Sequence, residues 1–327
     1  MARLRVGVIG VGSMGQNHAR VYSEIAELVG VADPDPKAGM KVADRFQVNY
    51  STDFRHLVEE GVDAVSVCTP TVHHFEVAKA VIEAGVHVLV EKPLCATLVE
   101  AEALAKLSED AGVVLAVGHI ERHNPTVAFA KKALVAGTWG DLITASARRV
   151  SSFPERIRDI GVILDLAVHE VDVLRYLAGS PVRTVYALGG KRKHEHFEDH
   201  ANILLEFQNG VSGFIEVNWL TPMKVRKLAL TCERNFVEID YTTQSAVISS
   251  ATVLPHDASN LYQIPFEYYF NSVSLKKEEP LKKELEDFLD AVRTKRAPLV
   301  TGRDAVETLR VAEAAMRSHR GGGRIEI

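Results

Sequence analysis

The chain has 327 residues, of which 46% are hydrophobic and 25% charged, with a formal net charge of −5 and a pI near 6.2. This length predicts about two domains, and the composition excludes general disorder. The acidic pI argues against nucleic-acid binding, and no apolar run approaches the ~20 residues of a membrane span. The N-terminal sequence lacks the apolar core and cleavage site of a signal peptide. We expect a cytoplasmic protein with no membrane or nucleic-acid partner.

Short apolar runs alternate with helical patterns over the first third of the chain. Strands are expected at residues 5–10, 29–33, 64–68, 87–91 and 113–117. Helices are expected at residues 18–28, 37–46, 74–84 and 97–111. Strands that alternate with helices form βαβ units with right-handed crossovers, which build a doubly wound parallel sheet. We place this Rossmann-type domain at residues 1–120.

The pattern changes after Gly118. Helices are expected at 125–136, 161–177, 284–292 and 303–318, and strands at 142–150, within 182–250 and at 324–327. Asn209-Gly210 separates two strand-like runs, and both residues tolerate the positive φ of a tight hairpin. The aromatic stretch 251–279 is expected to be irregular. Consecutive strands predict an α+β domain over 121–327 with a mostly antiparallel sheet.

A dinucleotide fingerprint follows the first expected strand. The segment Gly10-Val11-Gly12-Ser13-Met14-Gly15 has the GxGxxG form, and Asp33 stands 23 residues after Gly10. Gly10 permits a tight turn, Gly12 lets backbone N–H groups approach a pyrophosphate, and Gly15 allows close helix–strand packing. Asp33 would accept hydrogen bonds from ribose hydroxyls and would repel a 2′-phosphate. Since no arginine follows Asp33 directly, we expect NAD rather than NADP as the cofactor.

Two further segments follow expected strands of the same sheet. Glu91-Lys92-Pro93 follows the fourth strand, and Thr69-Pro70 with His74 follows the third. In a doubly wound sheet the ligand crevice lies beyond the carboxyl ends of the strands. These residues are therefore expected beside the cofactor, although a lysine such as Lys92, taken alone, is more often a solvated loop residue.

The combination of these motifs resembles the Gfo/Idh/MocA oxidoreductases, and the likeness continues through the segment 161–172 to the C-terminus. The resemblance implies a Rossmann domain, a C-terminal α+β domain with a large open sheet, and oxidation or reduction of sugars and cyclitols with NAD or NADP. It assigns catalysis to Lys92, Asp165 and His169. It implies cofactor contacts for Gly10, Gly12, Ser13, Met14, Gly15, Asp33, Thr69, Pro70, His74, Glu91 and Lys92. Thr71 stands where the family often has asparagine.

The chemistry of the three catalytic candidates agrees with this assignment. Asp165 and His169 are spaced i, i+4, so they lie on one face of a helix. Oxidation of a carbinol removes the hydroxyl proton as well as a hydride, and a histidine suits the proton transfer. Lys92 can stabilise the developing alkoxide. Some relatives are NAD-binding regulators without catalysis; retention of Lys92, Asp165 and His169 favours an enzyme.

The substrate expectation comes from the segments 118–125, 158–165 and 217–227. They look most like the nucleotide-sugar branch of the family, the UDP-N-acetylglucosamine 3-dehydrogenases, and the alternative is an inositol or free-sugar dehydrogenase. Arginine forks suit diphosphate oxygens. Arg148 and Arg149 would point to opposite faces of their strand, so at most one of them faces a ligand. Substrate contacts are expected from Lys92, Arg122, Asn124, Arg149, Arg158 and His169.

No metal is expected. Cys68, Cys95 and Cys232 lack zinc-ligand spacing and cannot form a disulfide framework. The acidic and histidine residues between 194 and 200 alternate around the start of a strand, so they do not converge on one ion.

Because an open antiparallel sheet needs one face covered, we expect a homodimer or homotetramer.

Overall fold

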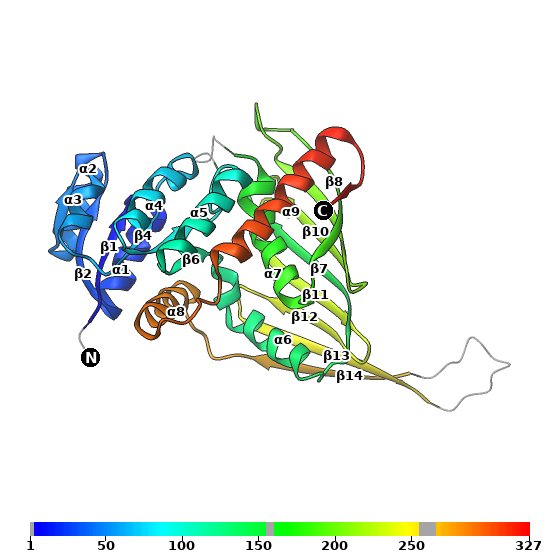
Figure 1. The fold of residues 1–327 in the computed structure, drawn as a ribbon. Coiled ribbons are helices and arrows are strands. Elements are labelled where there is room, and N and C mark those ends of the chain that lie inside the picture. The colour runs from blue at the N-terminus through cyan, green and yellow to red at the C-terminus, as the bar shows by residue number, and fades with distance from the viewer. Residues whose placement is uncertain (1–2, 155–159, 255–265) are drawn as a thin grey trace. The chain divides into compact units, whose positions relative to one another are not determined.

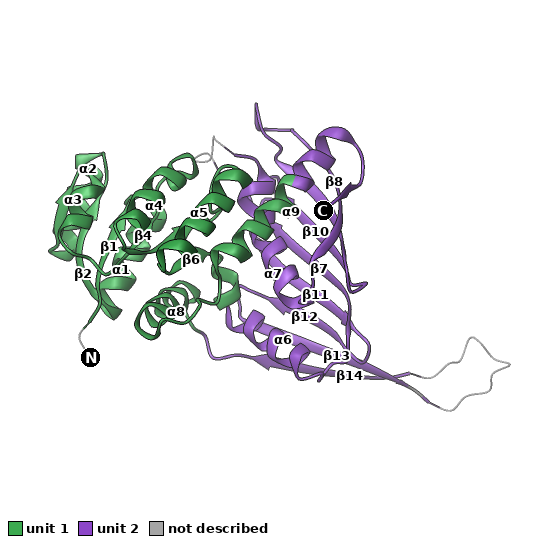
Figure 2. Ribbon diagram, viewed as in Figure 1, with its two compact units in different colours: residues 1–123, 278–313 green, residues 124–277, 314–327 purple. Residues whose placement is uncertain are grey.

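The computed structural model describes residues 3–154, 160–254 and 266–327. Contacts within the chain divide it into two compact units (Figures 1 and 2). Unit 1 consists of residues 1–123 and 278–313, and unit 2 of residues 124–277 and 314–327. None of the helices in the described ranges has both the length and the apolar character that crossing a membrane requires.

Unit 1 contains a six-stranded parallel sheet with the order β3-β2-β1-β4-β5-β6. Its strands are β1 (Arg5–Ile9), β2 (Glu27–Ala32), β3 (Asn49–Ser51), β4 (Ala64–Val67), β5 (His87–Glu91) and β6 (Leu115–Gly118). Its helices in the first part of the chain are α1 (Ser13–Ile25), α2 (Pro36–Phe46), α3 (Phe54–Glu59), α4 (His74–Glu83) and α5 (Leu98–Ala111), with the short 3-10 helices η1 (Thr71–His73) and η2 (Ile120–His123). The expected Rossmann fold is confirmed.

Local sequence explains most of these boundaries. The side chains of Asp35 and Asp53 accept backbone N–H groups at the starts of α2 and α3, and Thr97 forms a capping box with Glu100 at α5. Every residue of β4 is buried, as is usual for a central parallel strand. Two elements were not predicted, β3 and α3, because each is short. Helix α1 begins at Ser13, directly after the glycine loop, rather than at residue 18.

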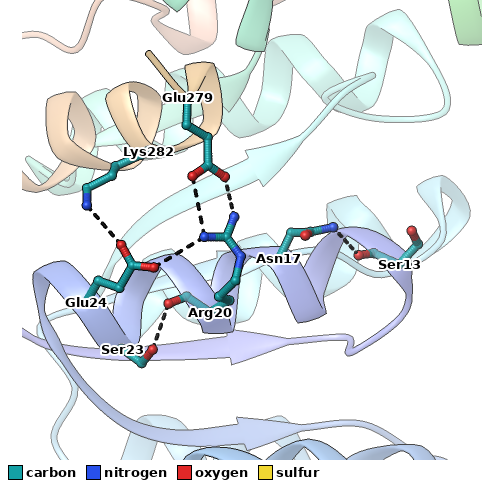
Figure 3. A network of polar contacts seen from close by, with 7 residues as sticks. All are labelled: Ser13, Asn17, Arg20, Ser23, Glu24, Glu279 and Lys282. Carbon is teal, nitrogen blue, oxygen red and sulfur yellow. Dashed lines mark hydrogen bonds and ion pairs between the residues drawn. The ribbon is translucent and has the colours of Figure 1, made fainter. Parts of the chain in front are cut away.

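Helix α8 (Pro280–Thr294) and most of α9 (Gly302–Gly321) belong to unit 1, not to the second domain expected over 121–327. The reason is the apolar face of α8, which enters the core formed by α1 and the sheet. Its core residues are Leu281, Leu285, Phe288, Leu289 and Val292. Arg20 of α1 also pairs with Glu279, and Lys282 donates to Glu24 at 2.9 Å (Figure 3).

Unit 2 contains a nine-stranded sheet with the order β14-β13-β12-β11-β7-β10-β9-β8-β15. Its strands are β7 (Leu142–Val150), β8 (Val182–Gly190), β9 (His200–Phe207), β10 (Ser212–Asn218), β11 (Val225–Cys232), β12 (Phe236–Asp240), β13 (Ser245–Val253), β14 (Phe266–Ser274) and β15 (Ile325–Glu326). All neighbouring pairs are antiparallel except β7 with β10. The expected mostly antiparallel sheet is confirmed.

Two details of this sheet differ from the sequence predictions. The hairpin between β9 and β10 has a positive φ at Gly210 but not at Asn209. Phe207 and Val211 close it by a backbone hydrogen bond of 2.9 Å, so the loop has three residues rather than two. The segment expected to be irregular contains β14, an edge strand on which Phe266, Tyr268 and Phe270 stack while exposed.

The two faces of the unit 2 sheet have different surroundings. Helix α7 (Val168–Ala178), preceded by the π-helix η3 (Ile163–Ala167), packs on one face, and α6 (Pro125–Val135) packs against α7. Inward positions of β10 are buried there, and a Cβ on Gly213 would lie 2.9 Å from Leu174 of α7. The opposite face carries exposed Leu188, Leu204 and Phe214. Helices thus cover one face of the sheet, and the other face, called the open face below, carries exposed apolar side chains.

Asp199 organises the loop before β9. Its Oδ2 accepts the backbone N–H groups of Arg192, Lys193 and His194 at 2.7, 2.6 and 3.0 Å, and its Oδ1 lies 3.0 Å from His200 Nδ1. Burial acts to raise the pKa of Asp199, but the hydrogen bond with His200 and those from the backbone outweigh it, so the pKa is about 2. The Asp199 carboxylate thus stabilises the conformation of its own loop.

We predict that Asp199→Asn lowers the free energy of unfolding by about 2 kcal/mol at neutral pH. Because the folded pKa of about 2 lies below the ordinary value of 3.8, this contribution is present above about pH 4 and is lost as the pH falls toward 2. Urea unfolding from pH 7 downward measures it, with the exposed neighbour variant Glu195→Gln as control. A difference from wild type that stays constant with pH would contradict the prediction.

Candidate active site

The loops that follow β1, β4 and β5 meet at the carboxyl edge of the unit 1 sheet, because these three strands are adjacent and parallel. Gly10 has φ +85°, and a Cβ there would lie 2.8 Å from the backbone carbonyl carbon of Cys68 and the nitrogen of Thr69. Only glycine fits both the backbone conformation and the contact. The glycine loop is therefore held directly against the loop after β4.

The other two fingerprint glycines have different surroundings. A Cβ on Gly15 would lie 1.8 Å from the carbonyl oxygen of Gly10, so the packing of α1 on the loop requires glycine. At Gly12, the N-cap of α1, nothing lies within 4 Å of an added Cβ. Ser13 and Met14 are exposed in the first turn, which contains no acidic residue. This open, positively polarised helix start fits a dinucleotide pyrophosphate.

Asp33 lies just after β2 and is half-buried. Its Oδ2 accepts the N–H of Val11 at 2.8 Å, and its Oδ1 accepts the N–H of Asp35 at 2.9 Å. The carboxylate therefore fixes the glycine loop from the end of the neighbouring strand. This is the end of β2 at which a bound ribose is expected in this fold.

The loop after β4 carries one polar atom that fits a ligand. Thr69 Oγ1 is buried and has no hydrogen-bond partner among the described residues, while Pro70 is exposed. His74, by contrast, is only 1% exposed, and its two ring nitrogens lie 2.9 Å from the carbonyl oxygens of Pro93 and Thr69. His74 therefore joins two loops of the protein.

Glu91 is the last residue of β5, and its side chain, like that of His74, bonds to other parts of the protein. Its Oε1 lies 3.0 Å from Nε2 of the fully buried His18, and its Oε2 accepts the backbone N–H of Lys92 at 3.2 Å. Burial acts to raise the pKa of Glu91, but the hydrogen bond and charge of His18 and the charge of Lys92 outweigh it, so the pKa is lowered. Lys92 itself is half-buried. The Glu91 carboxylate thus bonds directly to the backbone of Lys92.

Asp165 and His169 lie in unit 2, in and just after the π-helix η3. Both are half-buried. The sequence predicts an ordinary helix over this region; the structure has a π-helix at residues 163–167 that continues into α7. Single-turn π segments of this kind are frequent at functional sites. A π turn has more residues than an α turn, so a spacing of four residues still keeps the two side chains on one face.

Several expected substrate contacts are engaged within their own units. Arg122 is 4% exposed and donates to the carbonyl of Leu299 at 3.2 Å. Asn124 caps α6 by accepting the N–H of Thr126 at 3.1 Å. Arg149 forms a 2.5 Å ion pair with Glu170, and both residues are buried. Arg158 lies outside the described residues.

One group in the described part of the chain has the residue types of a metal site. His18, Glu91 and Glu284 are all buried, and one ligand atom from each lies within 4.8 Å of the others. The sequence reasoning missed His18 and Glu284. A signal for His18 was present, since its spacing from Gly15 and Tyr22 places it on the buried face of α1.

The glycine contacts generate a paired prediction. Gly12→Ala should leave the melting temperature unchanged, because its Cβ meets nothing, yet weaken NAD binding by about 10-fold or more by occupying the pyrophosphate position. Gly15→Ala should lower both stability and NAD affinity, since its Cβ overlaps a backbone oxygen. Thermal unfolding and fluorescence titration with NADH measure the two effects. Unchanged NADH affinity of Gly12→Ala would contradict the assignment of the phosphate site.

Family models match most of the chain. Residues 4–119 match the oxidoreductase family, NAD-binding Rossmann fold. Residues 127–239 match the GFO/IDH/MocA C-terminal domain, and residues 254–327 match the oxidoreductase family, C-terminal alpha/beta domain.

Similar proteins agree over nearly the full length. UDP-N-acetylglucosamine 3-dehydrogenase from Acidithiobacillus ferrooxidans is 31% identical over 97% of this chain and 96% of its own length. Its solved structure superposes with a TM-score of 0.87 at 29% identity, covering 98% of this chain and 99% of that one. NAD(+)-dependent scyllo-inositol 2-dehydrogenase from Bacillus subtilis is 28% identical over 99% of this chain and 96% of its own. GenD2 from gentamicin A biosynthesis, solved with NAD, is 26% identical, with a TM-score of 0.85 over 100% of this chain and 97% of its own. The chain therefore belongs to the Gfo/Idh/MocA family of oxidoreductases and is a dehydrogenase whose Rossmann unit binds NAD.

Proposed function

We propose that this dehydrogenase oxidises a sugar hydroxyl to a ketone, and that its substrate is UDP-N-acetylglucosamine, oxidised at the 3-hydroxyl. The observation that carries the substrate is the likeness to a UDP-N-acetylglucosamine 3-dehydrogenase over 97% of the chain. The glycine loop, the buried Thr69 Oγ1 and Asp33 fit NAD, which accepts the hydride when it is bound. The cofactor contacts we propose come from these residues together with Ser13, Met14 and Pro70.

The proposed chemistry divides between three side chains. His169 takes the proton of the substrate hydroxyl while the hydride leaves the same carbinol carbon. Lys92 stabilises the negative charge that develops on the oxygen. Asp165, one turn before His169, orients the imidazole and stabilises its protonated form. The half-buried positions of Lys92, Asp165 and His169 support these roles, since each retains access to a ligand.

Substitution of these residues tests the chemistry. His169→Ala should lower kcat by about 10²–10⁴-fold, the usual range for a general base. Lys92→Ala should cost at least as much, because it removes charge stabilisation at the alkoxide. Asp165→Asn should cost less than Asp165→Ala. All variants should still bind NADH in a fluorescence titration. Near-normal turnover by His169→Ala from pH 6 to 9 would overturn the assignment.

We propose Arg226 of β11 as a contact for the diphosphate of the substrate. It stands directly opposite Arg149 in the β7–β11 pair, so both arginines lie on the face that α7 covers. Arg226 is half-buried on the same face of the sheet as α7, which carries His169. Arginine suits the bidentate geometry of phosphate oxygens. The substrate contacts expected from Arg122, Asn124 and Arg149 stay predictions beside it, although each of these residues also has a partner within its own unit.

Arg148 offers a matched control for Arg226. It points to the opposite face, where its Nε donates to Glu216 at 2.6 Å and its side chain is 59% exposed. Arg226→Ala should raise KM for UDP-N-acetylglucosamine by about 10-fold, with a smaller change in kcat. Arg148→Ala should leave both constants near wild type. Equal effects of the two substitutions would exclude a specific diphosphate contact at Arg226.

The decisive experiment for the substrate is NADH formation across a panel of UDP-sugars, free sugars and inositols. The likeness to an inositol dehydrogenase over 99% of the chain makes free cyclitols the second candidate. We expect turnover with UDP-N-acetylglucosamine, inhibition by UDP, and a 3-keto product. Turnover of inositols without any effect of UDP would support the alternative.

We further propose that a second copy of the chain covers the open face of the unit 2 sheet, giving a homodimer or homotetramer in the cytoplasm. Leu204 and Phe214 pair directly on that face, and Leu188 is exposed beside them. The unpaired state of all three cysteines agrees with a reducing compartment. Light scattering should give a multiple of 35.9 kDa, and Phe214→Glu should lower it. A mass of one chain would contradict the proposal.

A further inference from the structure

The Glu91-Lys92-Pro93 turn is attached to the protein on both sides of its lysine by buried histidines. On one side, Nε2 of His18 lies 3.0 Å from the Glu91 carboxylate, whose other oxygen accepts the Lys92 N–H at 3.2 Å. On the other side, Nδ1 of His74 lies 2.9 Å from the carbonyl oxygen of Pro93. His18 is 0% and His74 1% exposed, so neither is placed to meet a substrate.

The surroundings of His18 bring three elements together. Helix α1 supplies His18, the end of β5 supplies Glu91, and α8 supplies Glu284, whose carboxylate belongs to the same buried group. The Glu91 carboxylate also needs space at β6, since a Cβ on Gly118 would lie 3.0 Å from its Oε2. The ion pairs Arg20–Glu279 and Lys282–Glu24 also join α1 to the start of α8 (Figure 3). The backbone of Lys92 is therefore bonded to Glu91, whose carboxylate in turn lies against residues of α1, β6 and α8.

The surroundings of His74 link the lysine turn to the cofactor loop. Its Nε2 lies 2.9 Å from the carbonyl oxygen of Thr69, in the loop that touches Gly10. Both partners are carbonyl oxygens, which only accept, and a neutral imidazole donates to one of them at a time. Burial lowers the pKa of His74 despite its hydrogen bonds to Pro93 and Thr69, which favours the neutral ring. The tautomer of His74 thus decides which loop receives the hydrogen bond.

We propose that His18 and His74 are positioning residues that fix the Glu91-Lys92-Pro93 turn and thereby the place from which Lys92 acts. This inference rests on the role proposed for Lys92 in the reaction. Under this proposal Glu91 and His74 position Lys92, whereas the sequence indicated that they contact the cofactor. Removal of either support should displace the ammonium group, and a displacement of about 1 Å can cost on the order of 10²-fold in rate.

A double-mutant cycle tests whether His18 acts through Lys92. His18→Leu should lower kcat by about 10²-fold with little change in KM for NAD. In a Lys92→Ala background the same substitution should cause almost no further loss, because the group it positions is gone. His18→Gln, which can still bond to Glu91, should recover most of the activity. Losses that multiply in the double variant would show a merely structural role and overturn the proposal.

His74 permits a finer test, because asparagine and glutamine reproduce different ring nitrogens. Asparagine places its amide near the position of Nδ1, toward Pro93, and glutamine near that of Nε2, toward Thr69. His74→Asn should therefore retain more kcat than His74→Gln. The reverse order, or equal activity, would exclude a role through Pro93.

Hydrogen exchange separates this inference from the proposed function. The amides of Glu91 and Lys92 should exchange faster in His18→Leu than in wild type. His87→Leu is the matched control, because His87 begins the same strand β5 and is only half-buried, with Nδ1 accepting the N–H of Val114 at 3.0 Å. If no sugar is oxidised, the proposed function fails, yet the exchange result still decides the positioning. Unchanged exchange in His18→Leu would overturn the inference.

Discussion

The candidate site of unit 1 depends on the parallel pairing of β1 with β4 and of β4 with β5. Parallel strands end at the same edge of a sheet, so segments distant in sequence become neighbours there. Gly10, Thr69 and Lys92 meet for this reason. Two features then fix these loops: Gly10 has no Cβ where the loop after β4 touches it, and the buried ring of His74 lies between the carbonyl oxygens of Pro93 and Thr69. The sheet determines which residues meet, and the buried polar groups determine how they are held.

Much of this arrangement could be predicted from the sequence. Alternating apolar runs and helices gave the Rossmann fold, and the expected strand 87–91 coincides with β5. The fingerprint predicted the turn at Gly10, because close backbone contacts require glycine at fixed positions within a short segment of sequence. Strand periodicity also placed Arg148 and Arg149 on opposite faces, which the ion pairs with Glu216 and Glu170 confirm.

What the sequence could not supply were the partners of polar side chains. Arg122, Asn124 and Arg149 have the residue types of ligand contacts, yet each bonds to a distant part of its own unit. Such pairings span sequence separations of up to 182 residues, which no local pattern encodes. The amphipathic pattern of α8 likewise shows that one of its faces is buried, but not that this face packs against α1. Strand β14 was missed because nearly all of its residues are exposed, so it lacks the alternation of buried and solvent-facing positions of a half-buried strand.

The return of α8 to the Rossmann core has a consequence for how the protein is made. Leu285 and Phe288 complete a core that also contains Val8 and Tyr22, so the first unit lacks part of its interior until about residue 290 has been synthesised. The intervening segment 124–277 supplies most of the second unit and emerges from the ribosome earlier. Domains generally fold as they are synthesised. The apolar surface of α1 that α8 covers therefore stays exposed until the second unit has been synthesised.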